Sequence, residues 1–265
     1  NFKTIIQFSQ ETFIKPSVRK NRTDSKTESF LKPSVRGGHM NETTQIHETI
    51  KSGDCIEIKF TGFTDGKPFD SNIAEDLKKV NERATPERTI LFVGKRMVVP
   101  GLDNSFVGKN LHTEYKIKIS ASEGFGPRRR ELVRTIPLKI FTQQKVMPVP
   151  GAAFVLDNQL ARVIAVSGAR VITDFNNPLS GKELEYKYTI IKVVTDLKDR
   201  TETACKLLLR FVPEIAVSEN EVTLKGPQVL KRFIEQNQDN FKQLIGVPIM
   251  FQEVEPQKEA TTETN

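Results

Sequence analysis

The sequence contains few of the residues that carry metal, redox or covalent chemistry. Its 265 residues include two cysteines and three histidines, and neither set has the spacing of a metal-binding or redox motif. Cys55 and Cys205 lie far apart in the chain, and small buried thiols are common in proteins of a reducing compartment. We therefore predict no disulfide, no metal site and no cofactor.

Long apolar runs are missing as well. No stretch approaches the roughly 20 apolar residues that a membrane helix needs, and the first residues lack the apolar centre of a secretory signal. The segment "GFTDGKP" lacks the G-x-x-x-x-G-K-[ST] spacing of a nucleotide-binding loop. These absences predict a cytoplasmic protein that binds neither nucleotide nor membrane.

The net charge of +7 is unevenly placed. Residues 1–39 hold eight Lys/Arg and three Asp/Glu, so five of the seven net positive charges lie there. The same segment holds a short repeat, "ETFIKPSVR" (11–19) and "ESFLKPSVR" (28–36). We expect Met40 to be the native start and the residues before it to be a leader. The alternative is a genuine disordered basic arm that contacts ribosome or nucleic acid, although we expect polypeptides rather than nucleic acid as partners.

Short β-rich runs alternate with turns from about residue 48. The patterns predict strands at 53–60, 88–94 and 114–120, and a short helix at 99–111 with Leu102, Phe106 and Val107 on its inner side. The first strand enters a hairpin that turns at Asp65-Gly66. The hairpin exits with an aromatic residue followed at once by a carboxylate, Phe69-Asp70, and the reason for this pair is the question that the local pattern raises.

The later part of the chain changes character twice. Residues 127–176 predict a small β-meander with turns at Asn158-Gln159 and Ser167-Gly168. A long strand follows at 181–194, with Leu184, Tyr186, Tyr188 and Ile190 on one face. Beyond residue 196 we predict four elements: a helix at 201–211 with Thr201 as its N-cap, a hairpin turning at Glu219-Asn220, one amphipathic helix at 227–246, and a closing strand "VPIMFQEV". The apolar stripe of the amphipathic helix is Val229, Leu230, Phe233, Ile234, Phe241, Leu244 and Ile245.

Five motifs follow one another in a distinctive order. They are "GDCIEIKFTG", "DGKPFDSN", "LFVGKRMVVPGLD", "SASEGFGPR" and "DFNNPLSGKELEYKYTIIKV". This order resembles the FKBP-type peptidyl-prolyl isomerases. The meander after "GFG" resembles the SlyD-like branch, whose insert-in-flap domain binds unfolded chains, and the last part resembles the C-terminal domain of long archaeal members. The resemblance covers about 48–195 with all five motifs and 196–255 weakly.

The resemblance implies an α+β fold. We expect an FKBP-type antiparallel half-barrel sheet wrapped on a short helix, with an inserted small β domain and a C-terminal α/β domain. The implied division is a disordered or non-native leader (1–47), an isomerase domain (48–126 plus 177–195), an insert-in-flap chaperone domain (127–176), a C-terminal α+β domain (196–256) and a disordered tail (257–265).

The resemblance also implies which residues line the proline pocket. Phe69 would pack on the proline ring, and Asp70 would sit at the pocket edge. Val98, Val99 and Leu102 would form the floor, Phe125 and Tyr186 the walls, and Phe60 would face the pocket as well. Taken singly, the apolar residues in this set are equally compatible with plain core positions.

Such a pocket needs no nucleophile, metal or general base. Rotation about an X–Pro bond passes through a twisted amide without resonance, over a barrier of about 18–20 kcal/mol. The twisted amide is less charge-separated than the planar one, so a dry apolar pocket favours it. Uncatalysed isomerisation takes about 10–100 s, which is slow enough to limit folding. We expect the partners to be unfolded or partly folded polypeptides with X–Pro bonds.

Two departures from the family pattern concern hydroxyl groups. Phe60 and Phe125 stand where the family usually has Tyr, whose hydroxyls bond the Asp and the substrate carbonyl. One lost hydrogen bond is worth about 0.5–1.5 kcal/mol, so we expect reduced isomerase activity. The alternative is a holdase chaperone whose isomerase activity is weak or lost.

The inserted segment carries many apolar residues for its size. We expect Ile136, Leu138, Phe141, Val146, Met147, Val149 and Phe154 to form an open groove for unfolded chains, acting without ATP; the alternative is a small tight core. The C-terminal segment could serve a homodimer or client binding, and its residues do not choose between these.

Overall fold

The structure is a computed structural model that describes residues 49–156, 159–218 and 221–254. The expectations for residues 1–47 and 257–265 therefore lie outside the described residues, as do parts of the two turns predicted at 158–159 and 219–220. In the part of the chain that is described, no helix is long and apolar enough to cross a membrane.

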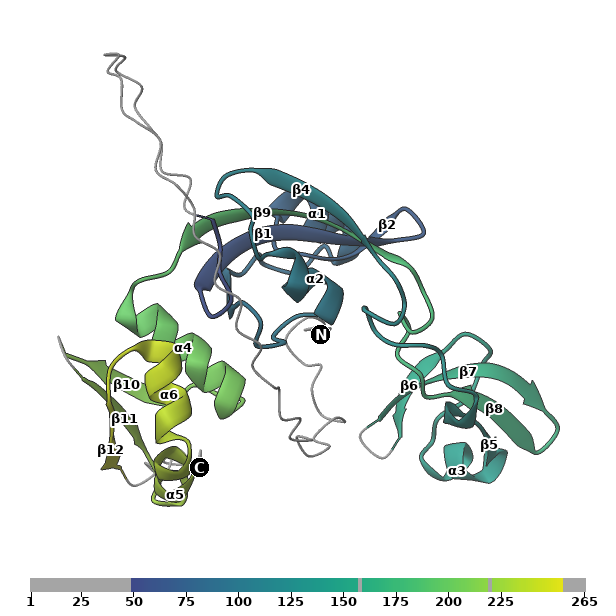
Figure 1. Ribbon diagram of the computed structural model, residues 1–265. Helices are drawn as coiled ribbons and strands as arrows, with labels where there is room; N and C mark the ends of the chain where they lie inside the picture. Colours follow the sequence, from purple (N-terminus) through teal and green to yellow (C-terminus); the bar gives the residue numbers. More distant parts are fainter. Residues whose placement is uncertain (1–48, 157–158, 219–220, 255–265) are drawn as a thin grey trace, which may run out of the picture.

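The largest sheet is antiparallel and has five strands. They are β1 (Cys55–Thr64), β2 (Lys67–Ser71), β3 (Thr89–Phe92), β4 (Glu114–Ile119) and β9 (Leu184–Val193). The order is β2-β1-β9-β4, with β3 also paired to β1. The long strands β1 and β9 lie side by side and curve over the short helix α2 (Pro100–Ser105), while α1 (Ala74–Val80) follows β2 (Figure 1). The expected half-barrel on a short helix is confirmed.

Alternation along the strands builds the core beneath this sheet. On β9, Leu184, Tyr186, Tyr188 and Ile190 are all buried, as predicted for one face of the strand. Leu102 and Phe106 of the α2 segment are buried against them. The prediction for Val107 was wrong, since its side chain is 50% exposed. The helix ends at Ser105 and the chain turns through Gly108 at φ +76°, so Val107 points away from the core.

A second sheet of four strands lies between β4 and β9 in the sequence. It comprises β5 (Val133–Pro137), β6 (Ala153–Leu156), β7 (Gln159–Ser167) and β8 (Arg170–Asp174) in the order β5-β8-β7-β6, preceded by the 3-10 turn η1 (Arg130–Leu132). The predicted meander is present as β6-β7-β8, but residues Leu138–Gln143 form the helix α3 instead of strand. Pro137 at its N-cap starts this helix, and Phe141 turns inward from it.

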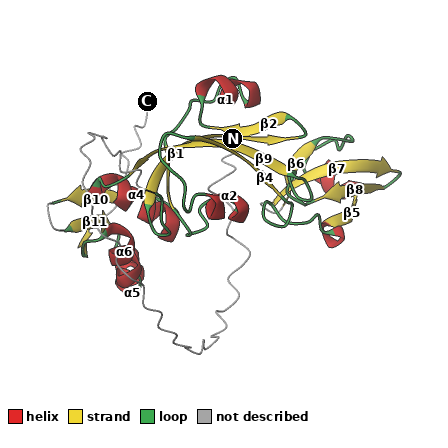
Figure 2. Cartoon of the chain, turned by 45° about the horizontal axis from the view of Figure 1, so that its top comes forward, coloured by secondary structure: helices red, strands yellow, loops and turns green. Residues whose placement is uncertain are grey.

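The C-terminal segment forms a third sheet covered by helices. Its elements are α4 (Leu197–Leu208), β10 (Glu214–Val217), β11 (Val222–Gly226), α5 (Val229–Gln236), α6 (Gln238–Ile245) and β12 (Ile249–Glu253). Strand β11 pairs antiparallel with β10 and parallel with β12. The second and third sheets lie at opposite ends of the large one (Figures 1 and 2).

Helix α4 begins earlier than the sequence predicted. Asp196 is the N-cap, because its carboxylate accepts a hydrogen bond from the Asp199 backbone N–H at 2.8 Å. Thr201 lies inside the helix, where its hydroxyl donates to the Leu197 carbonyl at 2.7 Å. The prediction of Thr201 as N-cap was therefore wrong. A threonine hydroxyl can cap a helix or, as here, donate to the carbonyl four residues earlier inside the helix.

The single amphipathic helix predicted for 227–246 is two helices. It breaks at Asn237, whose side-chain amide donates to the Phe233 carbonyl at 2.9 Å and competes with the helical bonding there. The break changes the phase of the apolar stripe: Ile234, Phe241, Leu244 and Ile245 are buried, whereas Val229 is 80% exposed and Phe233 is also exposed. Gly246 ends α6 in the left-handed region at φ +94°.

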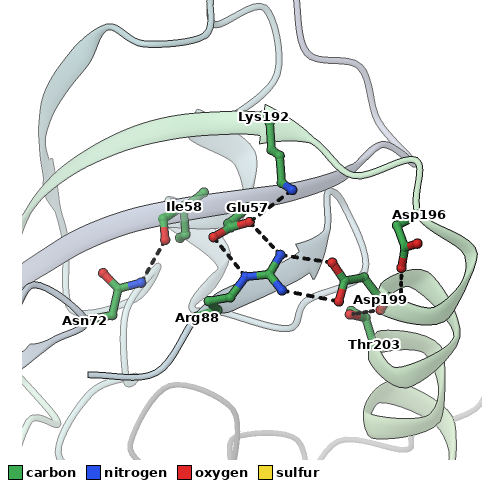
Figure 3. Close-up of polar contacts among 8 residues, drawn as sticks. All are labelled: Glu57, Ile58, Asn72, Arg88, Lys192, Asp196, Asp199 and Thr203. Carbon is green, nitrogen blue, oxygen red and sulfur yellow. Dashed lines mark hydrogen bonds and ion pairs between the residues drawn. The ribbon is translucent and has the colours of Figure 1, made fainter. Parts of the chain in front are cut away.

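Helix α4 fastens the third sheet to the large one. The Arg88 guanidinium lies between Glu57 of β1 and Asp199 of α4, at 2.8 and 2.9 Å, and Lys192 approaches Glu57 from β9 at 3.7 Å (Figure 3). Beneath this network one apolar cluster runs from the large sheet into the C-terminal elements. The two sheets therefore share a core.

Both cysteines belong to this shared core. Cys55 on β1 and Cys205 on α4 are buried and free, as the sequence predicted. Burial raises the pKa of each thiol to about 12, so neither is a reactive thiolate near neutral pH.

The four-stranded sheet has a separate core. Ile136, Phe141, Val163 and Val171 form it, and the Phe141 ring meets that of Phe154 edge-on at 4.9 Å between centroids. The two cores share no residue, so the small sheet can lose its packing without disturbing β1 and β9.

Replacing Phe141 with Ala tests this independence. We expect a loss of about 3–5 kcal/mol from the small core, seen as faster amide hydrogen exchange throughout β5–β8 and unchanged exchange in β1 and β9. Met147→Ala, in the same segment but exposed, serves as the control and should change neither region. Equal acceleration in β1 and β9 would show that the two units unfold together.

Candidate active site

The hairpin that raised the opening question carries a β-bulge at Phe69. In the register of β1 and β2, Gly62 faces Asp70 and the next residue, Phe63, faces Pro68, which leaves Phe69 as the extra residue. A bulge interrupts the alternation of side chains and re-aims one of them. Two consecutive residues, an aromatic and a carboxylate, can therefore serve the same side of the sheet.

Four aromatic rings gather beside this bulge. The Phe69 ring meets those of Tyr186 and Phe125 edge-on, at 5.8 and 6.3 Å between centroids. The Phe60 ring lies 6.4 Å from that of Tyr186. The rings come from β1, β2, β9 and the turn after β4, so segments far apart in the sequence build one aromatic surface.

Gly62 makes room for these rings at the centre of β1. A Cβ atom at this position would lie 2.7 Å from Phe69 Cζ and 2.9 Å from Tyr186 Cε1. Such distances are too short for any larger residue unless the rings move. The sequence motif "FTG" thus places glycine where two aromatic side chains close over the strand.

The predicted floor residues precede and enter α2. Val98, Val99 and Leu102 are buried in the same apolar cluster as the rings. Val99 stands before Pro100, which opens the helix. The structure thus brings together all seven apolar residues that were predicted for the site, six of them buried and Phe69 partly buried.

One functional position was missed by the sequence analysis. Asp103, fully buried in α2, accepts hydrogen bonds from the backbone N–H groups of Gly94 and Arg96, both at 2.8 Å. It thereby holds the loop that leads into Val98 and Val99. The signal in the sequence is a carboxylate directly after "VPGL", a position where acidic residues are common at the start of helices.

Asp70 has the most perturbed carboxyl group of the site. Burial raises the pKa of Asp70 to about 6, against the opposing effect of the Ser71 backbone N–H, which donates to it. Burial, and then the charge of Asp70, raise the pKa of Tyr186 well above its ordinary value. The Asp70 carboxyl group and the Tyr186 phenol therefore lie close enough to interact electrostatically.

The chemistry of this arrangement is that of an apolar receptor. It offers a dry aromatic surface with one carboxyl group at its edge. Among the described residues, no group of three or more His, Cys, Asp or Glu side chains could hold a metal ion.

The seven residues predicted to bind clients in the insert fall into different environments. Ile136 and Phe141 hold the core of the small sheet, and Leu138 and Phe154 pack against it. These four are a correction to the predicted open groove: Leu138 and Phe141 on α3, Ile136 on β5 and Phe154 on β6 all pack into the small core. Val146, Met147 and Val149 remain exposed in the loop after α3, with Met147 85% exposed.

A hollow of about 200 Å³ lies elsewhere on the small sheet. Its lining is Gly151, Ala153, Leu160, Ala161, Arg162, Asp174, Asn176 and Pro178. None of the predicted client-binding residues lines it. The sequence gives little indication of this hollow, because most of its lining residues are small or polar and they come from separate segments.

Comparison with known proteins matches two family models to the chain. The model for FKBP-type peptidyl-prolyl cis-trans isomerase covers residues 47–140, and the model named FKBP26, IF domain covers residues 134–179. The first includes Phe60, Phe69, Asp70 and the α2 segment, and the second includes most of the small sheet.

Three curated proteins illustrate the similarity. A short-type peptidyl-prolyl cis-trans isomerase of Methanocaldococcus jannaschii is 30% identical over 141 residues, which is 52% of this chain and 89% of that protein. A trigger factor of Paramagnetospirillum magneticum is 28% identical over 48% of the chain and 24% of its own length. The FKBP-type isomerase SlyD of Haemophilus influenzae is 26% identical over 37% and 53%.

The raised pKa of Asp70 predicts a pH-dependent stability. Unfolded chains release this proton near the ordinary pKa of 3.8, whereas the folded chain keeps it to about pH 6. The folded state binds more protons between these values, so the free energy of unfolding falls as pH rises through the window. Asp70→Asn should therefore be more stable than wild type by about 1–3 kcal/mol at pH 7 and equal to it below pH 4, measured by urea unfolding.

The matched control is Asp65→Asn, at an exposed carboxylate in the turn of the same hairpin. It should show no such gain between pH 4 and pH 7. Identical pH profiles for Asp70→Asn and wild type would contradict the buried position of the Asp70 carboxyl group.

Proposed function

Because the chain belongs to the FKBP-type peptidyl-prolyl cis-trans isomerases, we propose that it rotates X–Pro bonds in the aromatic cluster around Phe69. The observation that carries this proposal is the convergence of Phe69, Tyr186 and Phe125 edge-on over Gly62. Aromatic side chains offer large apolar contact area, which suits the apolar ring of proline.

The physical basis of catalysis is desolvation of the amide. Water stabilises the planar, charge-separated amide, and the pocket offers buried apolar groups in place of water: Phe60, Val98, Val99, Leu102, Phe125 and Tyr186. The twisted amide loses resonance and with it the charge separation that water favours. The pocket thus binds the twisted form more tightly than the planar one, which is what lowers a barrier.

Asp70 gives the pocket its one charged acceptor. Its carboxyl group lies at the edge of the aromatic cluster, partly buried, and receives a bond from the Ser71 backbone N–H. A peptide N–H of the bound chain is the natural partner for this group. We assign Asp70 to orienting the substrate and the buried rings to stabilising the twisted amide.

Isomerase activity tests the assignment in a short Ala-Leu-Pro-Phe peptide. We expect catalysis by wild type, a loss of about threefold to tenfold in kcat/KM for Asp70→Ala, and a gain of similar size for Phe125→Tyr, since one hydrogen bond contributes about 0.5–1.5 kcal/mol. Asp65→Asn is the control and should leave kcat/KM unchanged. Catalysis that is indifferent to both pocket variants would place the active site elsewhere.

We further propose that the small sheet holds unfolded polypeptide without ATP. The support is its match to the family model named FKBP26, IF domain, and the similarity of the chain to SlyD and trigger factor. Met147 and Val149 flank Pro148 and are exposed, at 85% and 57%, and β6 lies at one edge of the sheet. An exposed methionine adapts to varied partners, and a free edge can pair with an extended chain.

A refolding client tests the holdase activity. The double variant Met147→Ser, Val149→Ser should suppress aggregation several-fold less than wild type, while kcat/KM for the short peptide stays unchanged, because the variant removes apolar surface that only a long client reaches. Val107→Ser, at an apolar side chain that is 50% exposed just after α2, is the control. Full protection by the double variant would rule out this loop as the client site.

The division of the chain follows from these roles. We propose an isomerase unit at 48–126 plus 177–195, an insert at 127–176 and a C-terminal unit at 196–256. The shared core between the first and the last supports a rigid attachment of the C-terminal unit. A homodimer through that unit and a cytoplasmic location, which the free buried thiols favour, stay predictions.

A further inference from the structure

Tyr186 carries a buried hydroxyl group without an acceptor. Its side chain is fully buried, and within the described residues its Oη atom has no hydrogen-bond partner. The other two tyrosines of the chain differ: Tyr188 Oη donates to the Ser105 carbonyl at 3.1 Å, and Tyr115 Oη accepts from the Asn110 backbone N–H at 2.9 Å. Unpaired buried donors weaken a fold, so this hydroxyl calls for an explanation.

The orphan hydroxyl belongs to a residue of the aromatic cluster beside the bulge. Gly62 of β1 faces Asp70 on one side and Tyr186 on the other, so these two side chains flank the glycine on one face of the sheet. The Tyr186 ring also meets the Phe69 ring edge-on. The phenol therefore sits among the residues that would surround a bound proline.

The surroundings make this phenol a permanent donor. Burial and the neighbouring Asp70 charge both disfavour the phenolate, so the pKa of Tyr186 lies above its ordinary value. Its ring packing alone would be served equally by phenylalanine, as at Phe60 and Phe125 in the same cluster. What tyrosine adds at this position is one O–H group, which lacks an acceptor until something enters the pocket.

We propose that Tyr186 Oη donates a hydrogen bond to a backbone carbonyl of the bound peptide that flanks the rotating X–Pro bond. The inference rests on the proposed function of this pocket. A polypeptide brings a carbonyl with each residue, and it is the acceptor that a prolyl substrate always supplies. Tyr186 thereby provides from β9 a hydroxyl that Phe60 and Phe125 cannot provide.

The flanking carbonyl, and not the rotating one, is the acceptor for a physical reason. As the amide twists it loses resonance, and its oxygen loses negative charge and accepts hydrogen bonds less well. A donor on that oxygen would therefore hold the planar form and slow rotation. A donor on a neighbouring carbonyl binds planar and twisted peptide equally, which lowers KM without changing kcat.

Tyr186→Phe tests the proposal, with peptide isomerisation and thermal unfolding measured on the full chain. We expect KM to rise about threefold to tenfold with kcat unchanged, while the melting temperature rises because the orphan hydroxyl is gone. Tyr188→Phe is the matched control two residues along β9. It should lower the melting temperature, since it removes a satisfied bond to Ser105, and leave KM and kcat unchanged.

The possible outcomes distinguish the role proposed for the Tyr186 hydroxyl from the isomerase activity on which it rests. A higher melting temperature with KM and kcat both unchanged would overturn the proposal and leave Tyr186 as a packing residue of a working isomerase. A fall in kcat at constant KM would overturn it too, because the hydroxyl would then act on the twisted amide. If wild type catalyses no isomerisation, the proposed function fails first and the inference fails with it.

Discussion

The pairing of β1 with β9 is the constraint on which the rest of the structure depends. It joins residues more than 100 positions apart, from Ile56 with Val193 to Phe63 with Glu185. Strand β9 also pairs with β4, so the sheet is continuous only when the last strand lies between the other two. The chain must therefore leave the large sheet after β4 and return as β9 before the residues of the candidate site can meet.

Gly62 lies where this pairing and the hairpin pairing meet. It faces Tyr186 in one register and Asp70 in the other. Any Cβ there would collide with the Phe69 and Tyr186 rings, and the bulge at Phe69 brings a ring and a carboxyl group to the same side. The pair Phe69-Asp70 that looked odd in a simple hairpin is explained by this geometry: the bulge adds the aromatic residue without displacing the carboxylate from its partner.

The sequence predicted the elements whose apolar period is long and regular. Strand β9 alternates from Leu184 to Ile190, and its four inward residues were all identified. The motif order also predicted seven apolar site residues, and the structure places all seven in one apolar cluster. Residues of the small sheet were harder, because a short unit of about 50 residues has too few repeats of any period to separate the strand "LKIF" from the helix α3 that forms.

Other predictions failed where local hydrogen bonds compete with one another, because the spacing of apolar residues does not show which bond forms. Asp196 and Thr201 are both good caps, and only the entry direction of the chain into α4 decides for Asp196. Asn237 sits in a continuous helical period and breaks it through its own side-chain bond. The unpaired hydroxyl of Tyr186 is invisible in the sequence altogether, since pairing is a property of the folded neighbours.

The small sheet is joined to the pocket through two chain segments that polar bonds hold together. The Arg128 guanidinium meets the Asp174 carboxylate at 2.6 Å, and Asn176 exchanges two hydrogen bonds with the Arg129 backbone at 2.8 and 2.9 Å. No apolar cluster bridges the two described cores. Polar, exposed bonds of this kind fix the path of the chain while leaving the packing of each unit independent.

This joint begins and ends at the walls of the pocket. The outgoing segment leaves directly after Phe125, whose carbonyl accepts from the Ser180 hydroxyl at 3.1 Å, and the returning segment enters β9 just before Tyr186. Gly181 N–H donates to the Gly126 carbonyl at 2.8 Å and ties the two segments together at the pocket. If the small sheet holds clients as proposed, a bound client is tethered close to Phe125 and Tyr186 of the candidate site. Tethering keeps the X–Pro bonds of a bound client near the candidate active site. Their effective concentration there rises, although the intrinsic affinity of neither site changes.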